Sequence, residues 1–255
     1  MSGTSEQLGH AVYESTRRSV EKAWPEVASA ENLLGMVASA LAHLGGTVEG
    51  FRQLSGADMA CKSGCSFCCW LRIDVRAHEV FLILKELKAS RTASEMMALR
   101  SSAADVQASL TGLDLAQRDA VQRPCLLLRD GLCSVYDVRP APCRRYLSAS
   151  VAACEALWNG QPLDADIQHP VIAGMGRYAA TALHNTFVKN GYDGYSYDLP
   201  MALAEALENP DCEARWLAGE KAFSKAAESK TPPEFSQDAA LAGLRASLRK
   251  QESGA

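Results

Sequence analysis

Eight of the nine cysteines lie between residues 61 and 154, and four of those eight fall in nine consecutive positions. At the average density of this chain, such a window would hold about 0.3 of a cysteine. Thiols concentrated in this way constrain the fold, because the segments that carry them must converge if the sulfurs share a ligand. In chain order the eight are Cys61, Cys65, Cys68, Cys69, Cys125, Cys133, Cys143 and Cys154.

The start of the chain is polar and charged, without the apolar core and the cleavage site of a signal peptide. The longest apolar stretches, such as Val80–Leu84, are far too short to span a bilayer. We therefore expect a cytoplasmic protein with no membrane segment. In a reducing cytosol, clustered cysteines bind metal or do redox work more often than they form disulfides, so metal ions are the expected partners.

The first cysteine block has the spacing C-x3-C-x2-C-C. On a continuous helix its side chains would share a face of about 100°, although Gly64 favours a turn at Cys61 and a helix that begins near Cys65. Thiolate is the soft ligand that zinc and iron–sulfur clusters prefer. Adjacent side chains diverge on a helix, so Cys68 and Cys69 are expected to point to different metals or to different corners of a cluster. Eight thiols suffice for two four-thiolate sites, which favours more than one metal ion.

The second block begins in a predicted β-hairpin. Two short apolar runs flank Asp130-Gly131, the strongest short-range hairpin signal. We expect this hairpin to hold Cys125 and Cys133 across from each other. A lone cysteine in an apolar strand is usually a small core residue, but the company of the first block favours metal ligation for both.

The last three cysteines differ in their sequence context. Arg139-Pro-Ala-Pro should end the second strand and begin a short helix that carries Cys143. Spacing alone leaves Cys154 open between a metal ligand and an ordinary thiol. Cys212, far downstream, is interpreted as a surface or core thiol outside the site.

The remaining residues carry helical patterns. Apolar residues recur with a 3.6-residue period from Ser29 to Phe51, and Thr92-Ala-Ser-Glu95 is a capping box that should start a helix. We predict a mainly α, bundle-like single domain with a small β-hairpin and a central cysteine-rich metal site. Its parts would be N-terminal helices over 1–57, a zinc- or iron-chelating cysteine domain over 58–157 and a C-terminal helical region over 158–255. The expected helices cover residues 7–22, 29–51, 77–89, 92–110, 169–190, 200–208, 211–219 and 236–250, with a linker at 231–234.

Charge and motifs narrow the function classes. A net charge of −4 and a pI near 5.8 argue against a nucleic-acid binder, which usually carries a basic face. The chain has no G-x-S-x-G, GxGxxG or Walker A motif. Gly174-Met-Gly176 is too sparse for a phosphate loop and lies inside a helical pattern. We therefore assign no catalytic residue and expect a binding protein rather than an enzyme.

Basic residues and histidines near the cysteines have two possible roles. Four thiolates on a zinc dication leave a net charge of −2, which neighbouring arginines could offset by N–H···S bonds or through space. For Arg139 and Arg144 we expect a structural role at the site. For Lys62 and Arg76 we expect solvated surface positions, and for His78 a surface position at the start of a helix.

Both cysteine blocks resemble those of the YkgJ-like cysteine cluster family, whose CxxCxxCC signature belongs to zinc- or iron-chelating domains. The run from Cys61 to Cys69 is similar to that signature, with three residues rather than two in its first spacing, which leaves the role of Cys61 open. The block from Cys125 to Arg144 is similar to C-x-x-L…G-x-C-x-I-Y-x-x-R-P-x-x-C-R, and a later cysteine followed by an acidic residue also matches. The resemblance covers about residues 58–157 and implies that the matching cysteines chelate zinc or iron.

Three functions stay open at this point. The first is a metal-binding protein that holds zinc, iron or an iron–sulfur cluster through the eight cysteines. The second is an iron–sulfur-dependent protein-modifying enzyme, since the resemblance extends to flagellin lysine N-methylases that share the cysteine motif. The third is a thiol redox sensor that uses Cys68 and Cys69. The sequence names no protein partner.

Overall fold

The computed structural model describes residues 2–226 apart from residues 57, 63 and 162–166. Within this part of the chain, ten α-helices, two 3-10 helices and two small antiparallel sheets occur, which confirms the predicted mainly α fold. The helices are α1 (Ser2–Lys22), α2 (Ala30–Ser55), α3 (Ala77–Ser90), α4 (Ala93–Leu110), α5 (Leu115–Asp119), α6 (Ala141–Arg145), α7 (Val151–Trp158), α8 (Pro170–Lys189), α9 (Leu199–Glu208) and α10 (Asp211–Leu217). The short elements are η1 (Phe67–Trp70), η2 (Tyr136–Val138), β1 (Asp74–Val75), β2 (Leu128–Arg129), β3 (Leu132–Cys133) and β4 (Tyr197–Asp198).

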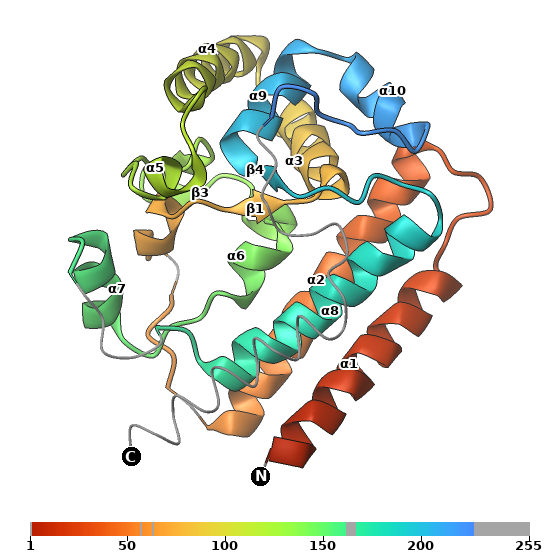
Figure 1. The fold of residues 1–255 in the computed structure, drawn as a ribbon, viewed down its shortest axis with the longest axis vertical. Helices are drawn as coiled ribbons and strands as arrows, with labels where there is room; N and C mark the ends of the chain where they lie inside the picture. Colours follow the sequence, from red (N-terminus) through yellow and green to blue (C-terminus); the bar gives the residue numbers. More distant parts are fainter. Residues whose placement is uncertain (1, 57, 63, 162–166, 227–255) are drawn as a thin grey trace.

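The three longest helices, α1, α2 and α8, lie side by side along one flank of the molecule (Figure 1). Gly9 lets α1 approach α8, because a Cβ there would lie 2.2 Å from the ring of Tyr178. Gly176 likewise lets α8 approach α6, because a Cβ there would lie 2.7 Å from the Cβ of Arg145. The Gly174-Met-Gly176 sequence lies inside α8 as expected, and its second glycine serves close packing.

The apolar stripe predicted for α2 is confirmed as the core face of that helix, which packs against α3, α6 and α8. The helix begins as expected at Ser29, whose side chain accepts a hydrogen bond from the Asn32 N–H. It ends at Gly56, whose φ of 62° lies in the left-handed region that favours glycine. The buried residues of the stripe are Leu33, Leu34, Met36, Val37, Leu41, Leu44 and Val48.

A second group of helices, α3, α4, α9 and α10, forms the opposite end of the molecule (Figure 1). The α3 ring of Phe81 stacks on Trp216 of α10 with centroids 5.1 Å apart. Thr92 and Glu95 form the predicted capping box at the start of α4. This local signal placed the start of α4 correctly.

Two small sheets cross the middle of the fold. The predicted hairpin is present as β2 and β3, with Asp130 at φ 51° and Gly131 at φ 76° in the turn. Its register pairs Leu128 with Cys133, so the expectation that Cys125 lies across from Cys133 is wrong. Sequence reasoning did not find the second sheet, in which β1 pairs with β4, because its strands are two residues long and far apart in the chain.

Two expectations lie outside the described residues, namely the linker at 231–234 and the helix at 236–250. Over the part of the chain that the structure describes, no helix has the length and apolar character needed to cross a membrane.

Candidate metal centre

The first cysteine block is a turn followed by one short 3-10 helix, not a continuous helix. Gly64, at φ 85°, supplies the expected turn, and the Cys65 N–H bonds to the Lys62 carbonyl at 3.1 Å. Only η1, which carries Cys68 and Cys69, is helical. The prediction of an α-helix beginning near Cys65 is therefore wrong, because the chain turns at Gly64 and extends again toward β1 after four helical residues.

The segment that precedes this turn is tied to the segment that leads into α7. The Ala60 N–H bonds to the Ser148 carbonyl at 2.9 Å. In return, the Ser148 N–H donates to the Cys61 sulfur at 3.2 Å. A backbone N–H that points at a sulfur stabilises a thiolate, so this contact suits Cys61 as a ligand. Cys154 is on α7 itself, and the fold thus brings the first and last cysteines of the cluster together.

The second block is tied to η1. The Cys125 N–H donates to the Cys69 carbonyl at 2.7 Å, and the Ser134 N–H donates to the Leu127 carbonyl at 2.8 Å, which closes the hairpin. The short helix that carries Cys143, α6, begins after Pro140 as predicted. Four separate pieces of chain therefore deliver thiols to one region: the turn with η1, the segment before β2, the hairpin and α6.

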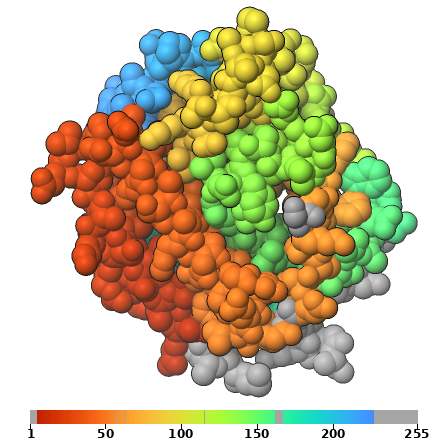
Figure 2. All heavy atoms as spheres, turned by 180° about the vertical axis from the view of Figure 1, so that it is seen from behind, coloured from red at the N-terminus to blue at the C-terminus, as the bar shows by residue number. Residues whose placement is uncertain are grey.

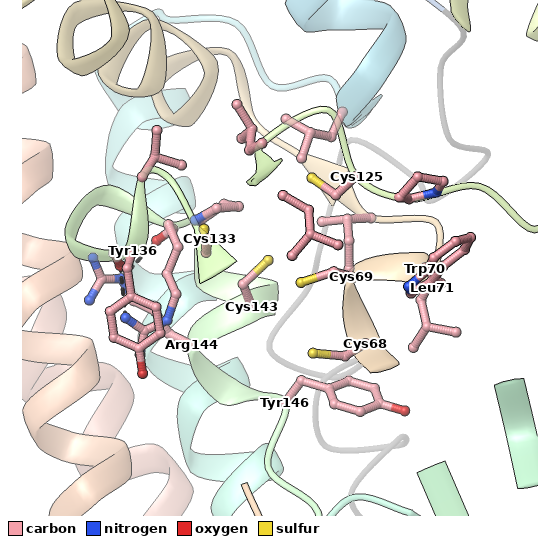
Figure 3. Close-up of a pocket in the computed structure, with 18 of the residues that line it drawn as sticks. Cys68, Cys69, Trp70, Leu71, Cys125, Cys133, Tyr136, Cys143, Arg144 and Tyr146 are labelled. Carbon is pink, nitrogen blue, oxygen red and sulfur yellow. Dashed lines mark hydrogen bonds between the residues drawn. The ribbon is translucent and has the colours of Figure 1, made fainter. Parts of the chain in front are cut away.

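A cavity of about 780 Å³ lies between these pieces, and seven of the eight predicted ligands line it. Seen from behind, the surface is hollowed between the orange residues of the first block and the green residues of the second (Figure 2). The close-up shows the sulfurs of Cys68 and Cys69 on the same side of η1, toward Cys143, with Cys125 and Cys133 around them (Figure 3). The seven are Cys61, Cys65, Cys68, Cys69, Cys125, Cys133 and Cys143.

Comparison with known proteins agrees with this geometry. Residues 60–161 match the CxxCxxCC family model. Its description is "Putative zinc- or iron-chelating domain". The match contains all eight clustered cysteines and covers less than half of the chain. No curated protein and no solved structure matches the sequence.

Within this CxxCxxCC segment, mutual repulsion of the thiolate charges shows which cysteines are neighbours. Burial raises the pKa of Cys143, and the nearby charges of Cys125, Cys68 and Cys133 raise it further. Burial likewise raises the pKa of Cys125 to about 11, with contributions from Cys133 and Cys68. Cys125, Cys133 and Cys143 therefore form one subset, which we call the hairpin subset, and Cys68 lies within its reach.

A second subset is centred on Cys61. Burial raises the pKa of this thiol, the hydrogen bond from Ser148 opposes the rise, and the charges of Cys65, Cys68 and Cys154 add to it. We call Cys61, Cys65 and Cys154 the loop subset. Cys68 again lies within reach, and a hydrogen bond with Cys69 is the largest cause of its own raised pKa. Cys68 is thus the residue that the two subsets share.

The donor set fits zinc and iron. All eight side chains are soft thiols, and thiolate is the ligand type that selects zinc and iron–sulfur clusters. Among the residues that the structure describes, no group of three or more His, Cys, Asp or Glu side chains already stands in metal-holding positions. The sulfurs lie around the cavity, and a metal would have to draw them closer together. Which of the eight cysteines ligate therefore stays a prediction.

The arginines near the cysteines either hydrogen-bond to backbone carbonyls or act on the thiols through their charge. Arg144 is buried and donates to the carbonyls of Arg139, at 2.8 Å, and of Asp137, as its expected structural role requires. Arg139 lies 3.7 Å above the Tyr136 ring, and its charge tends to lower the pKa of Cys133, which burial raises overall. Between the described residues, no arginine donates a hydrogen bond to a sulfur of the cluster, so the through-space alternative applies.

Other sequence expectations met different outcomes. Lys62 is exposed as predicted. Arg76 is half-buried and donates to the Gly194 carbonyl at 3.1 Å, so the prediction of a solvated charge is wrong. His78 is only 2% exposed and stacks on Phe187 with centroids 4.3 Å apart; the prediction of a surface histidine is wrong because α8 covers the start of α3. Cys212 is a core thiol, fully buried and apart from the cluster.

Proposed function

We propose that this chain is a cytoplasmic metal-binding protein that holds zinc or iron through its clustered cysteines. One observation carries the proposal: thiols from four separate pieces of chain line a single cavity. A hydrophobic core alone has no need to gather seven thiols, and cysteines left over from packing would be scattered through it. The family description of the matched segment supports the same chemistry.

The arrangement favours more than one metal ion or a multinuclear cluster. The loop and hairpin subsets each hold three thiols, and Cys68 is within reach of both. Cys69 follows it on η1 and points to the same side (Figure 3). A tetrahedral site needs four ligands, so we assign one cysteine of this pair to each subset. When bound, zinc would supply structural crosslinking, whereas an iron–sulfur cluster would add one-electron redox chemistry.

Metal analysis of the full chain, purified without oxygen, tests the proposal. We expect bound zinc or iron, with a brown visible spectrum only if an iron–sulfur cluster is present. Cys68→Ser should lose most of the metal together with part of the helical circular dichroism, because metal affinity and folding are coupled. Cys212→Ser, which removes a thiol outside the cluster, should keep the wild-type metal content.

Two results would overturn the proposal. One is a wild-type protein that folds and carries neither metal after growth and purification with both available. The other is equal metal content in wild type and in the Cys68→Ser variant, which would show that the shared thiol holds nothing.

A further inference from the structure

A second cavity, of about 220 Å³, lies between the start of α3, α6 and α8. Arginines from three elements line it: Arg76 before α3, Arg145 at the end of α6 and Arg177 on α8. His78 and His184 also line it, and burial holds the pKa of His78 well below its ordinary value. Such a concentration of guanidinium groups in a small cavity calls for an electrostatic explanation, since unpaired charge is costly away from bulk water.

Two of the three arginines have no hydrogen-bonding partner among the described residues. Arg76 donates to the Gly194 carbonyl at 3.1 Å. Arg145 and Arg177, both half-buried, make no hydrogen bond and no ion pair with any residue that the structure describes. Each guanidinium carries five N–H donors in a planar fork. None of these ten donors is hydrogen-bonded to a residue that the structure describes, although carboxylates and hydroxyls also line the cavity.

The two carboxylates that line the cavity are occupied elsewhere. Glu79 accepts the Ala141 N–H at 2.7 Å through one oxygen and the Arg76 N–H at 2.8 Å through the other. Asp74 is ion-paired with Arg72 outside the cavity. Burial lowers the pKa of Arg145 to about 10 and repulsion by Arg177 adds to the lowering, while the charges of Glu79 and Cys143 oppose it. Glu79 thus partly balances Arg145, whereas burial lowers the pKa of Arg177 without an opposing carboxylate. Guanidinium groups stay protonated in proteins, so the two arginines repel each other.

We propose that this cavity binds a small dianionic oxyanion of phosphate size, held between Arg145 and Arg177. The planar guanidinium fork matches two oxygens of a phosphate, and two forks on one anion replace mutual repulsion by charge-assisted hydrogen bonds. The close approach of α6 to α8 at Gly176 brings Arg145 beside the residue that precedes Arg177, and both side chains line the cavity. Because α6 also carries Cys143 two residues earlier, the bound anion would brace the helix that presents this thiol to the metal cavity.

Calorimetric titration of the full chain with inorganic phosphate, at constant ionic strength, tests the site. Arg177→Gln is the informative variant because α8 carries no cysteine, so the substitution removes no proposed metal ligand. We expect its phosphate affinity to fall at least tenfold. Arg100→Gln on α4 is the matched control: it removes the same charge from an exposed arginine and should change the affinity less than twofold.

Thermal unfolding gives a second readout that a merely structural arginine would not satisfy. In phosphate-free buffer, Arg177→Gln should unfold at or above the wild-type temperature, because it relieves repulsion with Arg145. Added phosphate should raise the unfolding temperature of wild type and of Arg100→Gln, but not of Arg177→Gln. Absence of phosphate binding to wild type, equal binding to Arg177→Gln, or a lower unfolding temperature of that variant without phosphate would each overturn the proposal.

Discussion

Glu205 of α9 offers the sharpest stability test in this fold. Its carboxylate is 1% exposed, and its two oxygens accept hydrogen bonds from three consecutive backbone N–H groups and one hydroxyl, while Oε1 also pairs with the Arg215 guanidinium at 3.4 Å. The Ser224 N–H and Oγ donate to Oε1 at 2.8 and 2.9 Å. The Lys225 and Ala226 N–H groups donate to Oε2 at 2.7 and 2.9 Å. A single side chain thus holds the segment that places Phe223 against the aromatic core.

We predict that Glu205→Gln destabilises the protein by about 2–6 kcal/mol. The amide keeps one acceptor oxygen, and its NH2 group meets the N–H groups that bonded the other, so two backbone donors lose their acceptor. Each buried donor without a partner costs about 1–3 kcal/mol. The total is a large fraction of a typical unfolding free energy of about 5–15 kcal/mol.

The pH dependence adds a signed check. Burial alone would raise the pKa of Glu205, but the N–H bonds from Ser224, Lys225 and Ala226 outweigh it and hold the pKa below its ordinary value. A lowered pKa contributes stability that is fully present above the ordinary value of 4.5 and is lost as pH falls through the folded-state pKa. The difference between wild type and Glu205→Gln should therefore shrink in acid.

Urea unfolding followed by tryptophan fluorescence measures both effects, since Trp216 stacks on Phe81, which also stacks on Phe223 of this segment. Glu208→Gln, at the exposed end of the same helix, is the matched control and should stay within about 0.5 kcal/mol of wild type. A loss below about 1 kcal/mol for Glu205→Gln at pH 7, or a difference from wild type that grows in acid, would refute the reasoning.

Three further predictions follow from the site and the packing. Cys154→Ser should remove only the metal held by the loop subset, leaving roughly half of the wild-type content by elemental analysis; complete loss would contradict the division into subsets. Burial raises the pKa of Asp198, against the opposing charges of Arg72 and Arg118 and with added repulsion from Asp74. Below the ordinary pKa of 3.8 the carboxyl is protonated in both the folded and unfolded states and does not change the free energy of unfolding, whereas above it the carboxyl lowers that free energy increasingly as pH rises. Asp198→Asn should therefore gain stability relative to wild type between pH 4 and pH 7 in urea titrations. Gly9→Ala drives a Cβ into an aromatic ring and should destabilise by about 1–3 kcal/mol, whereas Gly35→Ala meets nothing within 4 Å and should stabilise by about 0.5–1 kcal/mol; equal unfolding midpoints for the two would refute the packing argument.

Local signals predicted most of the helices and the hairpin, because their causes are local. They missed α5 and α7, and the helix expected near Cys65 is only the short 3-10 helix η1. The capping box at Thr92 satisfies backbone groups three residues away. The Asp130-Gly131 turn depends on the left-handed conformations of those two residues. The stripe on α2 follows from the 3.6-residue period of any helix with one buried face.

Errors arose where distant segments decide the outcome. His78 and Arg76 are polar residues at the start of a helix, and nothing near them in the sequence shows that α8 and the Gly194 loop cover them. The pairing of β1 with β4 joins residues more than a hundred positions apart. Such contacts depend on loop closure and packing, for which one sequence carries no readable period.

The cysteines show the same division. The sequence by itself determined that eight thiols are concentrated between residues 61 and 154, that their chemistry suits zinc or iron, and that Cys212 stands apart. Their grouping was decided only by the tertiary structure. Chain order suggested one quartet before residue 70 and another after residue 124. Instead, hydrogen bonds from the Ala60 N–H to the Ser148 carbonyl and from the Ser148 N–H to the Cys61 sulfur hold the segment before α7 beside the first block. Cys154, on α7, therefore lies near Cys61, and Cys68 is within reach of both subsets. Spacing limits which sulfurs can meet within one segment, but which segments lie together is set by hydrogen bonds and packing between residues far apart in the chain.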